Sequence, residues 1–288
     1  MDPLVSTAWL AANLKAPDLR IVDGSFYLPA ENKSARQEYL ERHIPGAVFF
    51  DIDDIADSSS SLPHMLPSPE KFSSKVRKLG LGDGLRIVVY DSRGGLFSAP
   101  RVRWTFKVFG HPEVAVLDGG LNKWLAENRP VEDGPPSPGE RHFTARANSF
   151  LVRELQQMQA NLKSKREQVL DARARARFEG ASPELWPGRR AGHIPGSRNP
   201  PYTELANADG TLKSPEELRQ LYAKAGIDLS APVITSCGSG ITAAVLALGL
   251  EVAGAKNVAV YDGSWAEWGL PELAGRDERP VATGPAER

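Results

Sequence analysis

The sequence predicts an α/β protein made of two tandem domains of similar structure, each a mostly parallel sheet flanked by helices. Three observations support this prediction. Sequence blocks recur in the same order about 150 residues apart, short runs rich in Val and Ile alternate with helical patterns, and a segment rich in Pro and Gly separates the two copies. A length of 288 residues accommodates two domains of ordinary size.

The repeat consists of four matched blocks. HIPG begins at His43 and again at His193, an offset of 150 residues. The other three pairs have offsets of 148, 146 and 144 residues and are centred on Asp23 and Asp171, Asp91 and Cys237, and Asp118 and Asp262. Two copies with a period of a whole domain indicate a tandem duplication and exclude a solenoid of many short repeats.

A linker is expected between the copies. The segment Glu132–Glu140 has Pro or Gly at five of its nine positions, which is typical of a connection without regular structure. We therefore predict an N-terminal domain over residues 1–134, a linker over residues 135–143 that includes Pro135, and a C-terminal domain over residues 144–288.

The expected strands and helices follow the repeat. Apolar runs at residues 87–90, 114–117, 232–235 and 258–261 lack polar alternation, so they predict strands buried on both faces. Helices are expected over residues 68–80 and 214–226, because each segment starts with Ser-Pro and ends at Gly. A third, apolar helix is expected over residues 243–250.

Composition narrows the class of protein. The net formal charge is −1, with 41% hydrophobic and 25% charged residues, which is typical of a globular protein and gives no reason to expect nucleic acid or an anionic membrane as a partner. The N-terminus does not resemble a secretory or transit peptide, and no apolar run is long enough to span a bilayer. We expect a cytoplasmic protein, and a mature organellar form stays an alternative.

The chain has one cysteine, Cys237, so an intramolecular disulfide and a multi-thiolate metal site are excluded. Cys237 follows an expected strand and opens the loop CGSGITA, which leads into an expected helix. Gly238 and Gly240 allow successive backbone N–H groups to point at one centre, where they would favour ionisation of the thiol and hold a charged sulfur species. The alternative for a single cysteine is a small buried apolar residue. Since Asp91 occupies the equivalent place in the first copy, only the second copy can use a thiol.

These features resemble the rhodanese-fold sulfurtransferases over essentially the whole chain. Within that family, CGSGITA is similar to the loop of the branch that takes sulfur from 3-mercaptopyruvate. Further blocks that match the family are Phe50–Asp53, His64–Leu66, Asp262–Trp265 and the pair Glu267 and Trp268. The resemblance implies an enzyme in which the Cys237 thiolate takes the sulfur of 3-mercaptopyruvate, releases pyruvate and becomes a persulfide. A thiol acceptor such as thioredoxin, or cyanide, then removes the sulfur, and neither a metal nor an organic cofactor is required.

The same resemblance implies substrate-binding residues. Arg177 matches an arginine that binds the substrate, whereas Arg173 and Arg175 are expected to be solvated surface charges. Further substrate contacts are expected from the loop residues Gly238, Gly240, Ile241 and Thr242. The family usually has a second arginine nine residues after the first, where this chain has Trp186, so we consider Arg189 and Arg190 as its replacements.

The resemblance also implies a proton relay of Ser239, His64 and Asp53, in which His64 takes the serine proton and the carboxylate orients the imidazole. In the alternative interpretation, His64 forms a structural hydrogen bond and Asp53 caps a turn. A tyrosine of the family is replaced by Phe97, so its hydroxyl is absent. His43 and His193 are expected to order their turns, and Trp265 and Trp268 to pack the second domain.

Three other functions are alternatives. A thiosulfate:cyanide sulfurtransferase is disfavoured, because Gly238 and Ser239 occupy positions where enzymes that use the thiosulfate dianion carry basic residues. A rhodanese-fold phosphatase is disfavoured because its loop ends in Arg, whereas this loop ends in Thr242 and Ala243. A persulfide-carrying module without catalytic activity is the third alternative.

Overall fold

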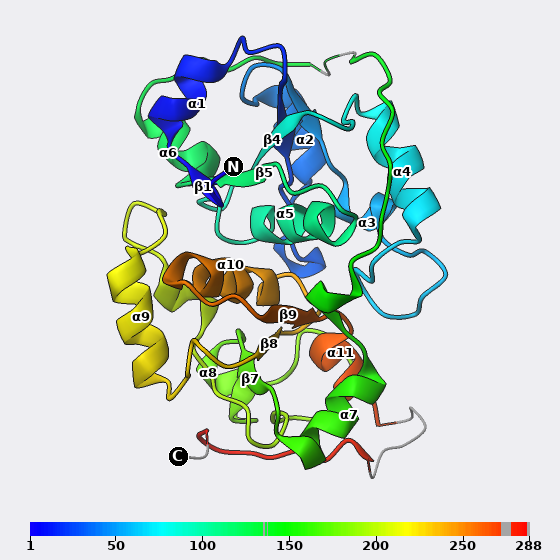
Figure 1. Ribbon diagram of the computed structural model, residues 1–288, viewed down its shortest axis with the longest axis vertical. Coiled ribbons are helices and arrows are strands. Elements are labelled where there is room, and N and C mark those ends of the chain that lie inside the picture. The colour runs from blue at the N-terminus through cyan, green and yellow to red at the C-terminus, as the bar shows by residue number, and fades with distance from the viewer. Residues whose placement is uncertain (135, 137, 272–277, 287–288) are drawn as a thin grey trace. The chain divides into compact units, whose positions relative to one another are not determined.

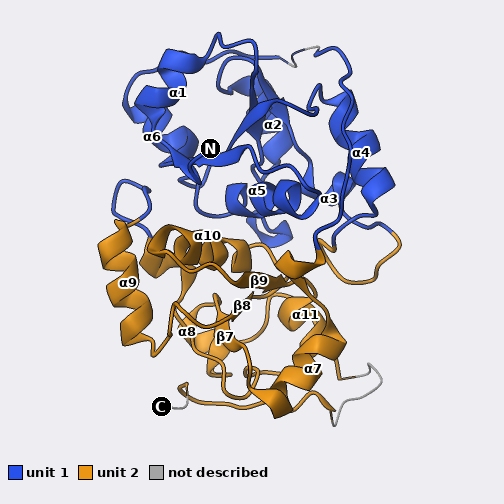
Figure 2. Ribbon diagram, in the orientation of Figure 1, with its two compact units in different colours: residues 1–58, 66–148, 206–212 blue, residues 59–65, 149–205, 213–288 orange. Residues whose placement is uncertain are grey.

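The computed structural model describes residues 1–134, 136, 138–271 and 278–286, so Pro135 in the expected linker lies outside the described residues. The chain divides into two compact units, coloured separately in Figure 2. Unit 1 comprises residues 1–58, 66–148 and 206–212, and unit 2 comprises residues 59–65, 149–205 and 213–288. Each unit therefore contains a short segment from the opposite half of the sequence. The domain limits at residues 134 and 144 stay a prediction.

Unit 1 contains a parallel sheet of five strands in the order β1-β5-β4-β2-β3. The strands are β1 (Leu4–Val5), β2 (Leu19–Asp23), β3 (Ala47–Phe49), β4 (Arg86–Tyr90) and β5 (Val114–Leu117). The helices are α1 (Thr7–Asn13), α2 (Ala35–Glu41), α3 (Ile52–Ile55), α4 (Pro69–Lys78), α5 (Ala99–Val108) and α6 (Gly120–Ala126), with the 3₁₀ turn η1 at Pro29–Glu31. Figure 1 labels most of these elements.

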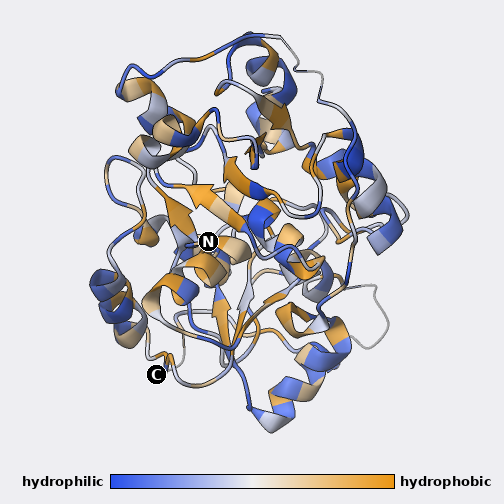
Figure 3. Cartoon of the chain, turned by 45° about the horizontal axis from the view of Figure 1, so that its top comes forward, coloured by the Kyte–Doolittle hydropathy of each residue, from blue (hydrophilic) through white to orange (hydrophobic). Residues whose placement is uncertain are grey.

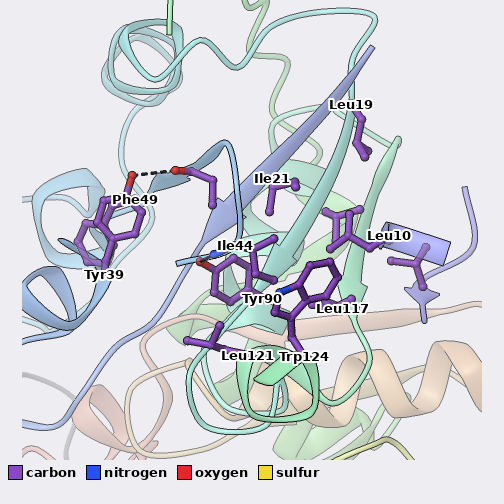
Figure 4. Close-up of a cluster of buried hydrophobic side chains, with 14 residues drawn as sticks. Leu10, Leu19, Ile21, Tyr39, Ile44, Phe49, Tyr90, Leu117, Leu121 and Trp124 are labelled. Atoms are coloured by element: carbon purple, nitrogen blue, oxygen red, sulfur yellow. Dashed lines mark hydrogen bonds between the residues drawn. The ribbon is translucent and has the colours of Figure 1, made fainter. Parts of the chain in front are cut away.

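One face of this sheet carries a core formed with α1, α2 and α6, shown in Figure 4. Leu10 and Trp124 contribute side chains from the helices, and Tyr90 contributes its ring from β4. The Tyr39 hydroxyl donates a hydrogen bond to the Ala47 carbonyl oxygen at 2.7 Å, so the buried phenol is paired. Elsewhere in the unit, Phe72, Phe106, Phe109 and Phe143 form a cluster of edge-to-face and stacked rings.

Unit 2 contains a parallel sheet of four strands in the order β6-β9-β8-β7. The strands are β6 (Val152–Arg153), β7 (Gln168–Asp171), β8 (Val233–Ser236) and β9 (Val258–Tyr261). The helices are α7 (Leu155–Ser164), α8 (Arg175–Phe178), α9 (Pro215–Lys224), α10 (Ala243–Ala253) and α11 (Ser264–Trp268), with 3₁₀ turns η2 (Ser149–Leu151) and η3 (Tyr202–Leu205). Helices α7 and α11 pack on the sheet through Met158, Trp265 and Trp268, so the expected packing role of these two tryptophans is confirmed.

The predicted fold class is therefore confirmed, and so are the four predicted strands and three predicted helices. The hydroxyls of Ser68 and Ser214 accept the N–H groups of Lys71 and Glu217, as N-caps do. Figure 3 shows that the strands are coloured mainly as hydrophobic, whereas most helices carry both polar and apolar residues. In the part of the chain that the structure describes, no helix is both long and apolar enough to cross a membrane.

Candidate active site

The loop that carries Cys237 joins β8 to α10, at the carboxyl end of a central strand of the second sheet. Gly240 adopts a left-handed backbone conformation with φ of 82°. This turn directs the Gly240 N–H toward Cys237, and it donates a hydrogen bond to the Sγ atom over 3.1 Å. A backbone N–H at this distance is placed to donate to a charged sulfur species formed at this position, such as a persulfide.

The first turn of α11 forms hydrogen bonds with the backbone of the Cys237 loop. The hydroxyl of Ser264 accepts the Cys237 N–H at 3.2 Å and donates to the Tyr261 carbonyl oxygen at 2.8 Å. The N–H groups of Trp265 and Ala266 donate to the carbonyl oxygens of Cys237 and Gly238, at 2.9 and 2.7 Å. These bonds fix the direction in which the cysteine side chain leaves the loop.

Ser264 was not predicted from the sequence, although the repeat contains a signal for it. Its counterpart in the first copy, 144 residues earlier, is Gly120, and both residues have positive φ, 49° for Ser264 and 56° for Gly120. Glycine adopts this conformation without strain, whereas serine does so at a cost. A serine at a position suited to glycine indicates that the hydroxyl is needed, and here it binds the nucleophile loop.

Two of the three predicted relay residues meet in unit 2. His64 belongs to the segment 59–65, and its Nδ1 lies 2.9 Å from Ser239 Oγ. His64 also has a positive φ of 60°, which is uncommon for residues other than glycine. Since the serine hydroxyl can donate to this nitrogen, the pair has the geometry needed to pass a proton.

The third predicted member, Asp53, lies in the first turn of α3 in unit 1. The alternative interpretation, that Asp53 caps a turn, also stays a prediction, although Asp53 is not the N-cap of α3. The N-cap of α3 is Asp51, whose carboxylate accepts the N–H groups of Asp53 and Asp54, both at 3.2 Å. The role of Asp53 in a relay stays a prediction.

Arg177 lies in α8 and is part of a chain of buried ion pairs. Its Nη2 and Nε atoms donate to Glu184 Oε2 at 2.5 and 3.2 Å, and the other oxygen of Glu184 accepts Arg173 Nη1 at 2.6 Å. Arg173 also pairs with Asp171 at 2.7 Å. Glu184 was not predicted from the sequence, where it is the second of two glutamates that follow the three arginines.

The expectation that Arg173 is a solvated surface charge is wrong. Its side chain is fully buried and stacks on the Trp265 ring, with Cζ 4.3 Å from the ring centroid. Burial alone would lower the pKa of Arg173, but the carboxylates of Asp171 and Glu184 reverse this and hold its pKa above the ordinary value. The side chain of Arg175 is 59% exposed, as expected.

Trp186 lies beside the active loop. A methyl group placed on Gly238 would be 3.1 Å from Arg177 Nη2 and 3.7 Å from Trp186 Nε1, so both side chains approach the residue that follows the cysteine. The Trp186 ring meets the His64 ring edge to face, with centroids 5.6 Å apart. The structure therefore brings together Cys237, Gly238, Ser239, His64, Arg177 and Trp186.

Arg189 and Arg190, the predicted replacements for a second substrate arginine, donate hydrogen bonds to backbone carbonyl oxygens. Arg189 donates to the carbonyl oxygens of Ala266 at 3.0 Å and Pro187 at 2.8 Å, and burial lowers its pKa. Arg190 donates to the carbonyl oxygens of Trp268 and Arg279, at 2.8 and 2.9 Å. These contacts brace the loop and the C-terminal segment, and substrate binding by either arginine stays a prediction.

The remaining predicted residues of the loop have structural contacts. The Ile241 carbonyl oxygen accepts the Ala244 N–H at 3.2 Å, and Thr242 is the N-cap residue of α10. Contacts of Ile241 and Thr242 with substrate stay a prediction. His193 is buried, stacks on Phe178 and hydrogen-bonds the Phe178 carbonyl oxygen through Nδ1 at 2.9 Å, which agrees with a structural role. Among the described residues, no group of three His, Cys, Asp or Glu side chains is placed to hold a metal ion.

Comparison with known proteins gives a consistent result. The sequence matches the rhodanese-like domain family over residues 6–127 and again over residues 153–270. It is 46% identical over 270 residues to 3-mercaptopyruvate sulfurtransferase from Homo sapiens, which covers 92% of this chain and 91% of the relative. It is 45% identical over 271 residues to thiosulfate sulfurtransferase from Rattus norvegicus, with coverage of 92% and 91%.

A solved structure is also similar to this chain. The crystal structure of SseA from Escherichia coli, described as a 3-mercaptopyruvate sulfotransferase with the rhodanese fold, superposes with a TM-score of 0.85 at 40% sequence identity. The match covers 93% of this chain and all of SseA.

Proposed function

The chain belongs to the rhodanese family, and from this premise we propose that it is a sulfurtransferase that takes sulfur from 3-mercaptopyruvate and passes it to a thiol or to cyanide. The observation that carries the proposal is the position of Cys237, at the end of a central strand with the Gly240 N–H 3.1 Å from its sulfur. The similarity to a human relative that is named for this donor supports the choice of substrate.

In the first half-reaction, the Cys237 thiolate attacks the sulfur of 3-mercaptopyruvate. A bond forms between the two sulfur atoms, the bond from sulfur to the methylene carbon breaks, and its electron pair goes to that carbon as the enolate of pyruvate. The substrate's thiol proton passes through Ser239 and His64 to the enolate carbon, so the products are pyruvate and a Cys237 persulfide anion. The 2.9 Å contact between Ser239 and His64 supports this proton path.

In the second half-reaction, an acceptor attacks the outer sulfur of the persulfide. A dithiol such as reduced thioredoxin becomes a disulfide and releases hydrogen sulfide, while cyanide becomes thiocyanate. Both reactions return Cys237 as a thiolate, so no metal or organic cofactor is required. A dithiol acceptor and a free thiol on Cys237 both suit a reducing compartment, and we propose the cytoplasm. Since a relative from Arabidopsis thaliana is named as mitochondrial, cell fractionation is the test of this location.

The second candidate function uses thiosulfate as the donor. It is favoured by the 45% identity to a relative named thiosulfate sulfurtransferase. The composition of the loop disfavours thiosulfate, because the two residues after Cys237 are the uncharged Gly238 and Ser239. The second negative charge of thiosulfate therefore has no cation to pair with at these two positions.

The test of the proposal is the Cys237→Ser variant. We expect 3-mercaptopyruvate to add one sulfur atom to the mass of the wild type and none to the variant, with sulfur transfer abolished in the variant. A side-by-side measurement of kcat/KM should favour 3-mercaptopyruvate over thiosulfate. The opposite order would support the second candidate, and a persulfide formed only by transfer from a desulfurase, without turnover of either small donor, would support a carrier module.

A further inference from the structure

The linker covers a surface of unit 1 at the end of α4. Pro138 lies against Gly80, since a methyl group placed on Gly80 would be 2.6 Å from Pro138 Cβ. The linker backbone also bonds to the loop that follows α4, because the His142 carbonyl oxygen accepts the Asp83 N–H at 2.8 Å. As a result, Gly80 is buried.

The equivalent surface of unit 2 lies at the end of α9, where the repeat places Gly226 146 residues after Gly80. Gly226 is exposed, and the nearest atom to a methyl group placed on it would be Arg198 Nε at 3.6 Å. A second pair of glycines shows the same contrast. A methyl group on Gly110 would be 3.0 Å from a carbonyl oxygen of the chain that follows the linker, whereas on its counterpart Gly254 it would meet no described atom within 4 Å. Within the described residues, the surface that the linker covers on unit 1 is therefore open on unit 2.

Hollows adjoin both surfaces at equivalent places. On unit 1, a hollow of about 440 Å³ is bounded by the HIPG turn, by β2 and by linker residues 136 and 138–141. On unit 2, a hollow of about 310 Å³ is bounded by the second HIPG turn, by β7 and by Gly226 and Ile227, and none of its described lining residues belongs to a linker. A further hollow of about 420 Å³ shares Arg198 and Gly226 with it and extends along the end of α9. We call these two hollows of unit 2 the unit 2 groove.

The unit 2 groove is positively charged. Lys165, Arg198 and Lys224 line it, and none of the three forms an ion pair with a described residue. The two carboxylates that line it, Glu167 and Glu204, are already paired with arginines, at 2.6 and 3.4 Å. The first copy has uncharged residues at the positions that correspond to two of the three lysine and arginine residues. A segment that enters the unit 2 groove therefore meets more positive charge than the linker meets on unit 1.

We propose that the unit 2 groove binds a proline-containing, acidic segment of a partner protein. The linker supports the form of this segment, because it covers the equivalent surface of unit 1 with Pro138 against Gly80. Proline restricts the backbone of the free segment, so less conformational entropy is lost on binding. The unpaired cations favour carboxylates beside the proline. No residue of the Cys237 loop lines the groove, so the inference does not depend on the proposed sulfur chemistry.

The probe for this site is a fluorescently labelled synthetic peptide with the sequence of residues 136–144 and the change Arg141→Glu. Fluorescence anisotropy measures its binding to the full chain. We expect it to bind at least about threefold more tightly than the unchanged linker sequence, because it carries an added carboxylate in place of a cation. A scrambled peptide of the same composition should bind at least about fivefold more weakly than the probe, because it loses the order of proline and carboxylates. A photoreactive group at the position of Pro138 should cross-link to the segment around Gly226.

The decisive variant is Lys224→Glu, which reverses the charge of an exposed residue that lines the groove. We expect it to weaken binding of the probe about tenfold, and high salt should reduce this difference. The matched control is Lys78→Glu, at the equivalent exposed position of α4, which should change binding by less than about twofold.

Four results would overturn the inference: no binding of the probe to the wild type, equal binding of the scrambled peptide, unchanged binding in Lys224→Glu, or a cross-link within unit 1. Light scattering tests a different occupant. A dimer of this chain that Lys224→Glu dissociates would assign the groove to a second copy and would also overturn the inference.

Discussion

At the scale of single residues, the position of Arg177 depends on a carboxylate that is itself buried. Glu184 has 2% of its side chain exposed and holds Arg177 and Arg173 with separate oxygen atoms. Its desolvation is offset by the two guanidinium groups, which is the arrangement in which a buried charge is tolerated. Glu184 therefore acts as a positioning residue, because it holds the arginine beside Gly238.

We predict that Arg177→Ala raises KM for 3-mercaptopyruvate at least tenfold, because the carboxylate of the donor loses its cation. Persulfide reduction by thiols should fall much less. The two half-reactions are measured separately, with a preformed persulfide for the second. The control is Arg175→Ala on the same short helix, whose exposed side chain pairs with Glu204 at 3.4 Å. Equal losses in both half-reactions of Arg177→Ala would assign Arg177 to the support of the fold.

At the scale of elements, the loop that joins β4 to α5 and the loop that joins β8 to α10 offer different acceptors to their backbone N–H groups. In unit 1 the carboxylate of Asp91 accepts N–H groups from five residues at 2.9 to 3.1 Å, namely Arg93, Gly95, Phe97, Ser98 and Ala99. The loop thus carries its own fixed anion, whereas the Cys237 loop gains one when the cysteine ionises or carries sulfur. The N–H groups of the Asp91 loop therefore have a structural role, whereas those of the Cys237 loop are available to a reacting sulfur atom.

We predict that Asp91→Ala lowers the free energy of unfolding of unit 1 by about 3 kcal/mol or more, because five N–H groups lose their acceptor in a buried loop. Urea unfolding measures this change. Asp54→Ala is the control, since the exposed Asp54 pairs only at the surface with Lys75, and a change of less than about 1 kcal/mol is expected. A similar small change in Asp91→Ala would mean that water replaces the carboxylate without cost.

At the scale of the whole molecule, equivalent carboxylates of the two units differ in their environment. Asp171 ends β7 and pairs with Arg173, whereas Asp23 ends β2 and accepts the Ser25 N–H at 2.9 Å. Burial raises the pKa of Asp23 to about 6, although hydrogen bonds from Ser25 and Tyr90 oppose this shift. The folded chain therefore holds the Asp23 proton to a higher pH than the unfolded chain does, and Asp23 destabilises unit 1 increasingly as the pH rises from about 4 to 6.

We predict that Asp23→Asn stabilises unit 1 at pH 8 by roughly 2–3 kcal/mol relative to the wild type, and by much less at pH 4.5, where the folded wild type keeps the proton. Urea unfolding at both pH values gives the difference. The control is the exposed Asp18, whose pKa is lowered chiefly by its hydrogen bond with Arg86. Asp18→Asn should therefore show a small effect of the opposite sign. A pH-independent effect of Asp23→Asn would contradict the raised pKa.

Much of the fold could be predicted from the sequence, because its signals are local or repeated. The Ser-Pro starts of α4 and α9 determine hydrogen bonds within one turn, and the repeat identified the thiol loop without knowledge of a contact. The burial of Arg173 could not be predicted, since it depends on Glu184 and Trp265, which approach it only in the folded unit. The same holds for Ser264 and Trp186, which reach the Cys237 loop from 27 residues later and 51 residues earlier in the chain.

The division of the chain into units bears on whether its two halves can be separated. Residues 59–65 of the first copy belong to unit 2, and residues 206–212 of the second copy belong to unit 1. A gene split at the linker would therefore leave the thiol-bearing half without His64, and the other half without its borrowed segment. We therefore expect the two halves to be functional only when they are expressed as one chain, because neither half contains all the residues of its own unit.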